Sequence, residues 1–164
     1  MSKILFFIIG IIFSSTTLFA GIIDIVHYDT EKDPGTIFIN TQEKRLYFLV
    51  DYQLAYVYPI AVGKKKHQFF GKYTISKKVK WPAWYPTAKT LKEKPWLPNF
   101  VEGGQNNPLG ARAMYLGDSL YRIHGTNSPN SIGKEASRGC IRMHNDDVIE
   151  LYGLINTGSE VYVQ

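Results

Sequence analysis

Residues 45–62 read RLYFLVDYQLAYVYPIAV, and this stretch decides the fold class. Aromatic and β-branched side chains dominate the segments 45–50 and 54–62, which is the composition of β-strands. Asp51-Tyr52-Gln53 separates the two segments as a short turn, and Gly63 ends the second segment. The stretch therefore predicts a β-hairpin, the clearest one in the chain.

Further strands are expected on both sides of this hairpin. The other segments of this kind are 36–40, 71–76, 113–116, 120–123 and 160–163. One helix is expected over 145–152, with Asn145 or Asp146 as its N-cap and Gly153 as its stop. Many strands and one helix predict a mainly β fold, a sandwich or barrel with one short helix packed on it.

The segment 77–110 interrupts the strand pattern. All three tryptophans of the chain lie in it, together with several prolines that prevent a regular β ladder. Long ordered loops in compact domains are commonly lids or binding walls. Two interpretations are open: the aromatic side chains form such a wall, or they cover one open end of the core.

The first twenty residues differ from the rest of the chain. Lys3 is their only charge, residues 4–12 are almost entirely apolar, and hydroxyl side chains follow before Ala20. This layout predicts a secretory signal peptide over 1–20, with an uncleaved N-terminal anchor as the alternative. With either interpretation the rest of the chain is expected to leave the cytoplasm, and a processed chain is expected to keep no stable membrane span.

The charge of the chain fits that compartment. The formal net charge is +5 at pH 7, and the isoelectric point is about 9.2. Such a balance favours an anionic partner, such as a cell wall or a membrane surface. The basic residues are scattered along the chain, so nucleic acid is not an expected partner.

Cys140 is the only cysteine of the chain, so an internal disulfide is excluded. A lone thiol in an exported protein indicates an intermolecular link or a reactive group. His124 lies sixteen residues earlier, and the polar loop between them is long enough to bring the two side chains together. An imidazole can take the thiol proton and hold the thiolate as an ion pair, which makes the thiol a strong nucleophile.

Neighbouring residues can complete such a site. The carbonyl of Gly125 can orient His124 through the second ring nitrogen. Gly139 permits a tight turn, so its N–H and that of Cys140 can form an oxyanion hole. Arg142 supplies a positive charge that can bind a substrate carboxylate or steady the loop.

The His–Cys pair also has two non-catalytic interpretations. The pair can arise by chance, because two such residues at this spacing are not specific. A zinc site formed by His124, Cys140 and His144 is the second, although it lacks a clear fourth ligand.

A resemblance to a known family narrows these interpretations. His-Gly-Thr at 124–126, Ser-Arg-Gly-Cys-Ile-Arg-Met at 137–143 and Asn-Asp at 145–146 follow one another in order. With Asn-Pro-Leu-Gly-Ala-Arg at 107–112 and the aromatic-proline loop 81–87, they resemble the L,D-transpeptidase catalytic domain, also called the YkuD or ErfK/YbiS/YcfS/YnhG family. The resemblance covers about 36–164, which is the expected catalytic domain.

The sequence departs from the family pattern at two points. Arg138 stands where many members carry His, although Arg is a familiar variant there. Phe69-Phe70-Gly71 stands where a Thr-Pro-x-Gly pattern is usual, which puts the neighbouring strand start in doubt but not the chemistry.

The resemblance implies a sandwich-like fold with mixed sheets, Cys140 as the nucleophile and His124 as the proton donor and acceptor. Gly125 would orient His124, and Gly139 would contribute its backbone to the oxyanion hole. The residues then expected at the substrate are Ser137, Arg138, Arg142, Trp84 and Tyr85.

The implied reaction is cysteine acyl transfer on peptidoglycan stem peptides, without metal or cofactor. A tetrapeptide stem would lose its terminal D-alanine, and an amine acceptor would give a 3-3 cross-link. Water as acceptor would give L,D-carboxypeptidation, and an envelope protein would become attached to the wall. Carbapenems are expected to acylate Cys140. A papain-like or sortase-like enzyme fits the residue order poorly, and a catalytically silent wall-binding module is the alternative from another class.

Overall fold

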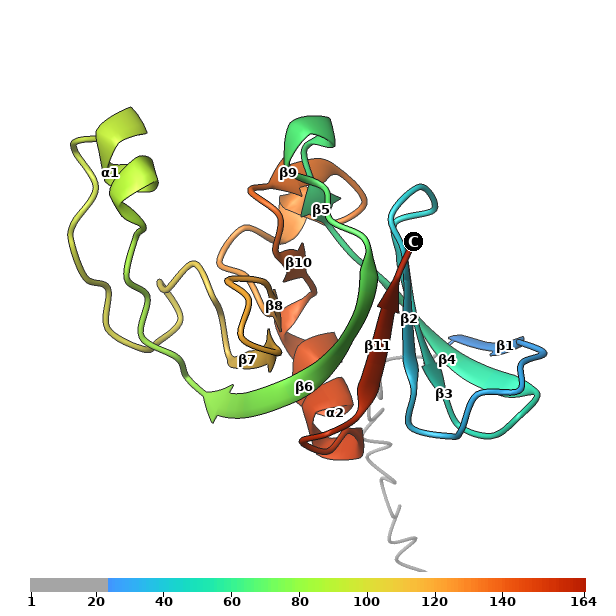
Figure 1. Ribbon diagram of the computed structural model, residues 1–164. Helices are drawn as coiled ribbons and strands as arrows, with labels where there is room; N and C mark the ends of the chain where they lie inside the picture. Colours follow the sequence, from blue (N-terminus) through green and yellow to red (C-terminus); the bar gives the residue numbers. More distant parts are fainter. Residues whose placement is uncertain (1–23) are drawn as a thin grey trace, which may run out of the picture.

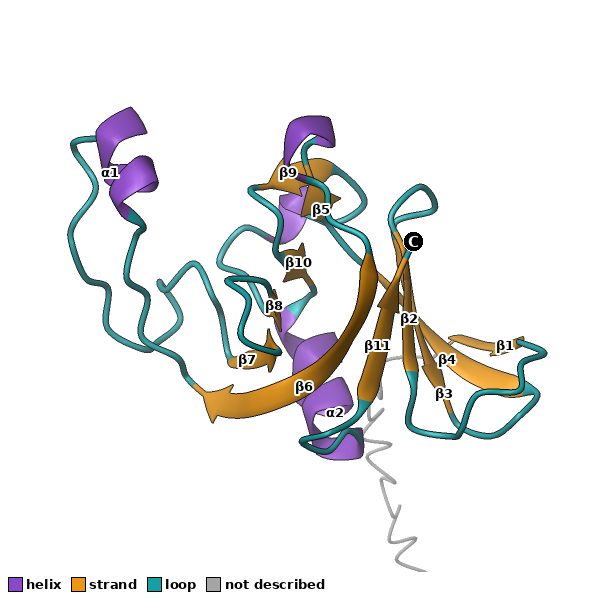
Figure 2. Cartoon of the chain, viewed as in Figure 1, coloured by secondary structure: helices purple, strands orange, loops and turns teal. Residues whose placement is uncertain are grey.

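The computed structural model describes residues 24–164 and has a mainly β architecture built on one long sheet (Figures 1 and 2). Nine strands pair in the order β1-β4-β3-β2-β11-β6-β7-β8-β10, and β5 pairs separately with β9. The strands are β1 Asp24–His27, β2 Ile37–Asn40, β3 Arg45–Leu49, β4 Leu54–Pro59, β5 Val62–Gly63, β6 Gly71–Lys80, β7 Arg112–Leu116, β8 Arg122–His124, β9 Glu135–Ser137, β10 Ile141–Arg142 and β11 Glu160–Val163. The helices are α1 Ala88–Glu93 and α2 Asn145–Leu154, with 3-10 turns η1 Lys65–His67 and η2 Pro129–Ser131. The predicted signal peptide, residues 1–20, lies outside the described residues.

The predicted hairpin forms, but its second strand is shorter than expected. β3 pairs antiparallel with β4, which ends at Pro59, a residue with no N–H to donate to a ladder. The chain then crosses to the other half of the sheet, where Ala61 pairs with Arg142 and β5 runs parallel to β9. The segment 54–62 is therefore not one strand: its first part pairs with β3 in the long sheet, and its end pairs with β9 in the two-stranded sheet.

β6 joins the two halves of the long sheet. It continues past the expected end at residue 76 to Lys80 and curves strongly along its length (Figure 1). Its first half pairs antiparallel with β11, which in turn runs parallel to β2. Its second half pairs with β7 after a register shift between Ile75 and Lys77. Such irregularities bend a strand and increase its twist, so β6 folds the sheet around one core.

Helix α2 follows β10 and packs against β7, burying Val148 and Leu151. Its ends differ from the prediction: His144 is the N-cap residue without a side-chain capping bond, and Gly153 lies inside the helix, which ends at Leu154. Mixed sheets with a helix after Cys140 were predicted correctly, whereas the expectation of a single helix is wrong because α1 also forms. Within residues 24–164, no helix has the length and apolarity needed to cross a membrane.

The chain between β6 and β7, residues 81–111, forms an arm that carries α1 and is otherwise mostly loop (Figure 2). The two sides of the arm pair through the backbones of Trp84 and Val101. Its large aromatic side chains face solvent, since Trp96 is 76% exposed and Tyr85 is 68% exposed. The interpretation that these rings cover an open end of the core therefore fails for them.

Candidate active site

The expected site lies where β8 and β10 run side by side. They pair in parallel, with Ile141 opposite Ile123 and Arg142 opposite His124. Both isoleucines are fully buried in the core. Side chains alternate between the two faces of a strand, so His124 and Arg142 point to the opposite face, and Cys140 begins the same row. The register thus brings the thiol and the imidazole to one face as diagonal neighbours.

His124 is buried and held by its neighbour. Its Nδ1 lies 2.5 Å from the carbonyl oxygen of Gly125. A carbonyl only accepts, so Nδ1 carries the proton and Nε2 is left as the basic nitrogen. The predicted orienting contact is therefore present. Burial lowers the pKa of His124 from 6.5 to about 3, the Gly125 carbonyl opposes this shift, and Arg142 and Arg122 add to it.

Cys140 is half-buried, and its thiol does not bond to His124. The Sγ atom instead lies 3.8 Å from the carbonyl oxygen of Leu120. Burial raises the pKa of the Cys140 thiol, while Arg122 and Arg142 act in the opposite direction. A lowered imidazole pKa and a raised thiol pKa favour the neutral pair. These directions do not favour the expected thiolate–imidazolium ion pair in the resting site, and that pair stays a prediction.

The loop before Cys140 is fixed by Ser137. Its hydroxyl donates to the carbonyl of Cys140 at 2.5 Å and accepts the N–H of Gly139 at 3.0 Å. Ser137 is buried and fixes the turn, and its expected contact with substrate stays a prediction. The N–H of Gly139 is likewise engaged, which removes it from the expected oxyanion hole and leaves the N–H of Cys140 as the candidate donor.

Gly139 is nevertheless required for the shape of this turn. Its φ is +123°, a region that side chains rarely adopt. A Cβ placed there would lie 2.6 Å from the ring of Tyr121. That ring stacks on Phe69 with centroids 3.8 Å apart. Phe69, part of the departure from the family pattern, therefore supports the surface on which the cysteine loop rests.

The two motif arginines have different surroundings. Arg142 is half-buried and reaches the Ser131 hydroxyl at 3.4 Å, with its charge facing the site. Burial lowers the pKa of Arg142, and Cys140 opposes that shift. Arg138 is exposed and bonds to the arm, donating to Thr90 Oγ1 at 2.8 Å and pairing with Glu93 Oε2 at 2.6 Å. Arg138 thus ties α1 to the cysteine loop, and its expected role at the substrate stays a prediction.

Trp84 and Tyr85 lie on the same arm, before the helix α1 that Arg138 contacts. Trp84 is half-buried and fixed through its backbone to Val101. The Tyr85 ring lies against Phe100, with centroids 5.1 Å apart. They stand on the segment that Arg138 connects to the nucleophile loop, so a role as a substrate wall stays a prediction.

Asn145 is a site residue whose role the sequence did not reveal. Its Oδ1 accepts the N–H groups of Ala111 at 3.0 Å and Thr126 at 3.2 Å, and its Nδ2 donates to the Thr126 carbonyl at 3.0 Å. A Cβ on Gly125 would lie 2.2 Å from that Oδ1. Asn145, the first residue of α2, therefore holds the His-Gly-Thr turn in place. The Asn-Asp motif could be seen in the sequence, but the hydrogen-bond partners of Asn145 come from segments distant along the chain.

The histidine of the zinc hypothesis has another place in the fold. His144 is the N-cap residue of α2. Across residues 24–164, no three side chains of the His, Cys, Asp and Glu types gather as metal ligands. The zinc hypothesis therefore has no support in the geometry.

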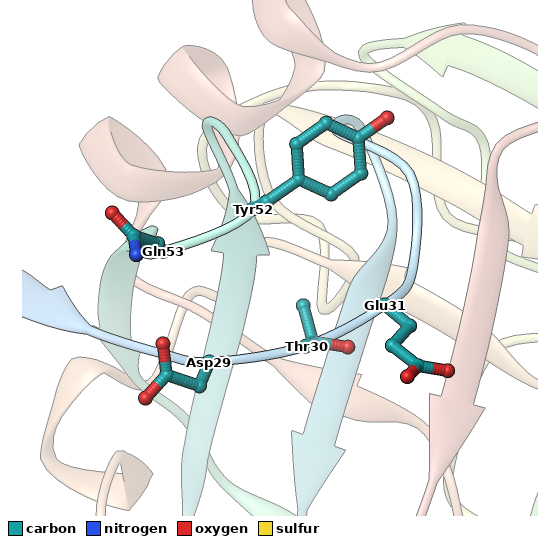
Figure 3. A pocket seen from close by; sticks show the side chains of 5 residues that line it. All are labelled: Asp29, Thr30, Glu31, Tyr52 and Gln53. Carbon is teal, nitrogen blue, oxygen red and sulfur yellow. The ribbon is translucent and has the colours of Figure 1, made fainter.

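A surface hollow of about 460 Å³ lies away from the β8–β10 face (Figure 3). Its lining comes from the chain after β1 and from the β3–β4 turn: Asp29, Thr30, Glu31, Tyr52 and Gln53. None of these lining residues belongs to the His124–Cys140 site.

Comparison with known proteins gives the same assignment as the geometry. The sequence pattern of the L,D-transpeptidase catalytic domain, YkuD, matches residues 34–163. The chain belongs to this family. The probable L,D-transpeptidase ErfK/SrfK of Escherichia coli is 37% identical over 134 residues, which are 77% of this chain and 43% of that protein. The chain thus spans less than half the length of that relative.

Solved structures support the fold. An L,D-transpeptidase from Mycobacterium smegmatis superposes with a TM-score of 0.63 at 20% identity, covering 79% of this chain and 58% of that one. A Brucella melitensis protein named a probable carnitine operon oxidoreductase has a TM-score of 0.58 at 44% identity, covering 86% and 92%. That name describes different chemistry, whereas this chain carries the His-Gly-Thr and Ser-Arg-Gly-Cys motifs of the L,D-transpeptidase family.

Proposed function

We propose that this protein is a peptidoglycan L,D-transpeptidase exported to the periplasm or cell wall, with its catalytic domain over 36–164. The observation that carries the proposal is the placement of the only thiol and of an imidazole oriented by the Gly125 carbonyl on one face of adjacent strands. Membership of the L,D-transpeptidase family supports it. The signal-like residues 1–20 support export.

The first half-reaction is acylation of the thiol. The Cys140 sulfur attacks the carbonyl carbon of the third residue of a tetrapeptide stem, and Nε2 of His124 takes the thiol proton. The bond to the terminal D-alanine then breaks, and His124 returns the proton to the leaving amine. The N–H of Cys140 would donate to the oxyanion of the tetrahedral intermediate. The product is a thioester on Cys140.

The second half-reaction depends on the acceptor. An amine from a neighbouring stem attacks the thioester carbonyl, its proton passes to His124, and the thiol is released with a new 3-3 cross-link. Arg142 would bind a carboxylate of the donor stem, and Trp84 and Tyr85 would line the approach along the arm. Water could attack the same thioester, which would give L,D-carboxypeptidation. The amine of an envelope protein could also attack it, which would attach that protein to the wall.

The test is turnover of a disaccharide tetrapeptide by the purified protein, followed by liquid chromatography and mass spectrometry. Dimers lacking one terminal D-alanine are expected. They should be absent with Cys140→Ala and unchanged with Arg45→Gln, which removes a charge at the exposed first position of β3. A carbapenem should add its mass to the protein only when Cys140 is present.

Different products would redirect the proposal. Tripeptide without dimers would identify an L,D-carboxypeptidase or a requirement for another acceptor. Wall binding that persists in Cys140→Ala, with neither product nor adduct in the unaltered protein, would favour a silent wall-binding module.

A further inference from the structure

Arg122 lies next to the proposed nucleophile, although no motif drew attention to it. Ile123 is opposite Ile141 in the parallel ladder, so the preceding residues, Arg122 and Cys140, are neighbours across the two strands. Their side chains belong to the same face as His124. The Arg122 guanidinium lies over the ring of Tyr115, 4.9 Å from its centroid, on the adjoining strand β7.

The side chain of Arg122 has an unsatisfied polar atom. Its Nε is buried and has no hydrogen-bond partner. Among residues 24–164 the ion pairs join His27 to Asp29, Lys72 to Glu160 and Arg138 to Glu93, so neither Arg122 nor Arg142 has a carboxylate. Partly buried cations without partners are costly unless an anion joins them in the working state. A thiolate at Cys140 is the anion that the neighbouring strand can supply.

The surrounding charges argue against a protonated His124 as the cation that stabilises the Cys140 thiolate. Arg122 and Arg142 both disfavour protonation of His124, whose pKa burial already lowers to about 3. The same two cations favour ionisation of Cys140, against the effect of burial. Other titratable groups on adjoining elements include Tyr115, Tyr121, Lys65, Lys66 and His67, with Arg138 and Glu93 at the arm and Glu135 on β9. Of the two carboxylates, Glu93 is engaged by Arg138 and Glu135 is exposed, and neither pairs with Arg122.

We propose that Arg122, and not a protonated His124, is the counter-charge that stabilises the thiolate of Cys140. The inference takes Cys140 as the nucleophile and in that respect rests on the proposed function. In the reaction, neutral His124 takes the proton of the un-ionised thiol at Nε2 as the sulfur attacks and returns it to the amine as the bond to the leaving group breaks, while Arg122 stabilises the negative charge that develops on the sulfur. Arg142 remains free for a substrate carboxylate.

The test is the ionisation of the thiol in the absence of any substrate. Cys140 is the only cysteine, so iodoacetamide alkylation and thiolate absorbance at 240 nm both report on it alone. Both would be followed from pH 5 to 10 for the unaltered protein, Arg122→Gln, Arg122→Lys, His124→Asn and the exposed control Arg45→Gln. Circular dichroism and thermal unfolding would establish that each variant is folded.

Loss of the Arg122 charge should slow alkylation at pH 7 by roughly tenfold, with rates converging at alkaline pH. Arg122→Lys should recover most of the rate, and Arg45→Gln should match the unaltered protein. His124→Asn should abolish turnover yet leave the thiol titration close to that of the unaltered protein.

Two results would overturn the inference. One is a folded Arg122→Gln protein with an unchanged thiol titration. The other is a titration that moves to higher pH in His124→Asn but not in Arg122→Gln, which would identify the imidazolium as the counter-charge. Should Arg122→Gln fail to fold, the lysine variant and His124→Asn still separate the two arrangements. Because no substrate is used, failure of transpeptidation does not affect this result.

Discussion

At the scale of single residues, the site depends on keeping His124 neutral. The imidazole is 4% exposed, its Nδ1 proton is held by Gly125, and two arginines face it. A buried neutral base can accept a proton only as charge moves in the reaction, which suits a group that carries the proton from thiol to leaving amine. The same burial has a consequence for stability that can be measured without substrate.

We expect stability to fall as the pH drops below 6.5. In the unfolded chain His124 takes a proton near its ordinary pKa of 6.5, whereas the folded protein resists protonation down to about 3. The unfolded state therefore binds more protons between these values, and each pH unit costs about 1.4 kcal/mol of unfolding free energy. The stabilisation is complete above pH 6.5 and is lost progressively towards pH 3.

Urea unfolding at a series of pH values would measure this dependence. In the variant His124→Gln, the unfolding free energy should change less steeply with pH between 6.5 and 3, by the amount that corresponds to about one proton taken up on unfolding. Cys140→Ala is the matched control, because it inactivates the same site while leaving His124 in place. Equal slopes in the unaltered protein and His124→Gln would contradict the assignment of a buried neutral histidine.

At the scale of elements, the arm and the cysteine loop are joined by a contact between exposed side chains. Arg138 and Glu93 are 39% and 49% exposed, and Thr90 of α1 shares the guanidinium. Exposed ion pairs contribute little to global stability, about 1 kcal/mol or less. The contact can therefore order α1 against the site without stabilising the whole fold.

Removing the carboxylate should release the arm selectively. For Glu93→Gln we expect a change in unfolding free energy of about 1 kcal/mol or less, but faster amide hydrogen exchange over 88–93. KM for the donor stem should rise more than kcat falls, because Trp84 and Tyr85 belong to the same arm. Lys92→Gln changes an exposed charge on the same helix and should leave exchange unaltered. Unaltered exchange in Glu93→Gln would mean that the arm is ordered by other contacts.

At the scale of the whole molecule, strands with dense aromatic and β-branched side chains could be predicted from the sequence. β2, β3, β7 and β11 lie close to the segments expected for them. β9 and β10 could not, because strands of two or three residues carry no periodicity, and they exist only where β5 and β8 run beside them. Burial of His124 and the bonds of Asn145 to Ala111 and Thr126 likewise depend on segments brought together by the fold.

The curved strand β6 belongs to both halves of the sheet, and its centre is a point where they can be tested together. Ile75 is 1% exposed and lies at the register shift, between the pairing with β11 and the pairing with β7. Ile75→Ala should cost about 2–5 kcal/mol, since it removes buried methyl groups at the point where the halves share one core. Val79→Ala, at a half-buried position further along β6, should cost less.

Hydrogen exchange with mass spectrometry would reveal whether the halves unfold together. Peptides from β3 and from β8 should lose protection by equal free energies in Ile75→Ala, because a single core unfolds as one cooperative unit. Loss of protection confined to β7, β8 and β10 would instead mean that the catalytic half unfolds on its own. In the cooperative case, positions far from Cys140, such as those on β3, set the fraction of molecules in which thiol and imidazole share a face.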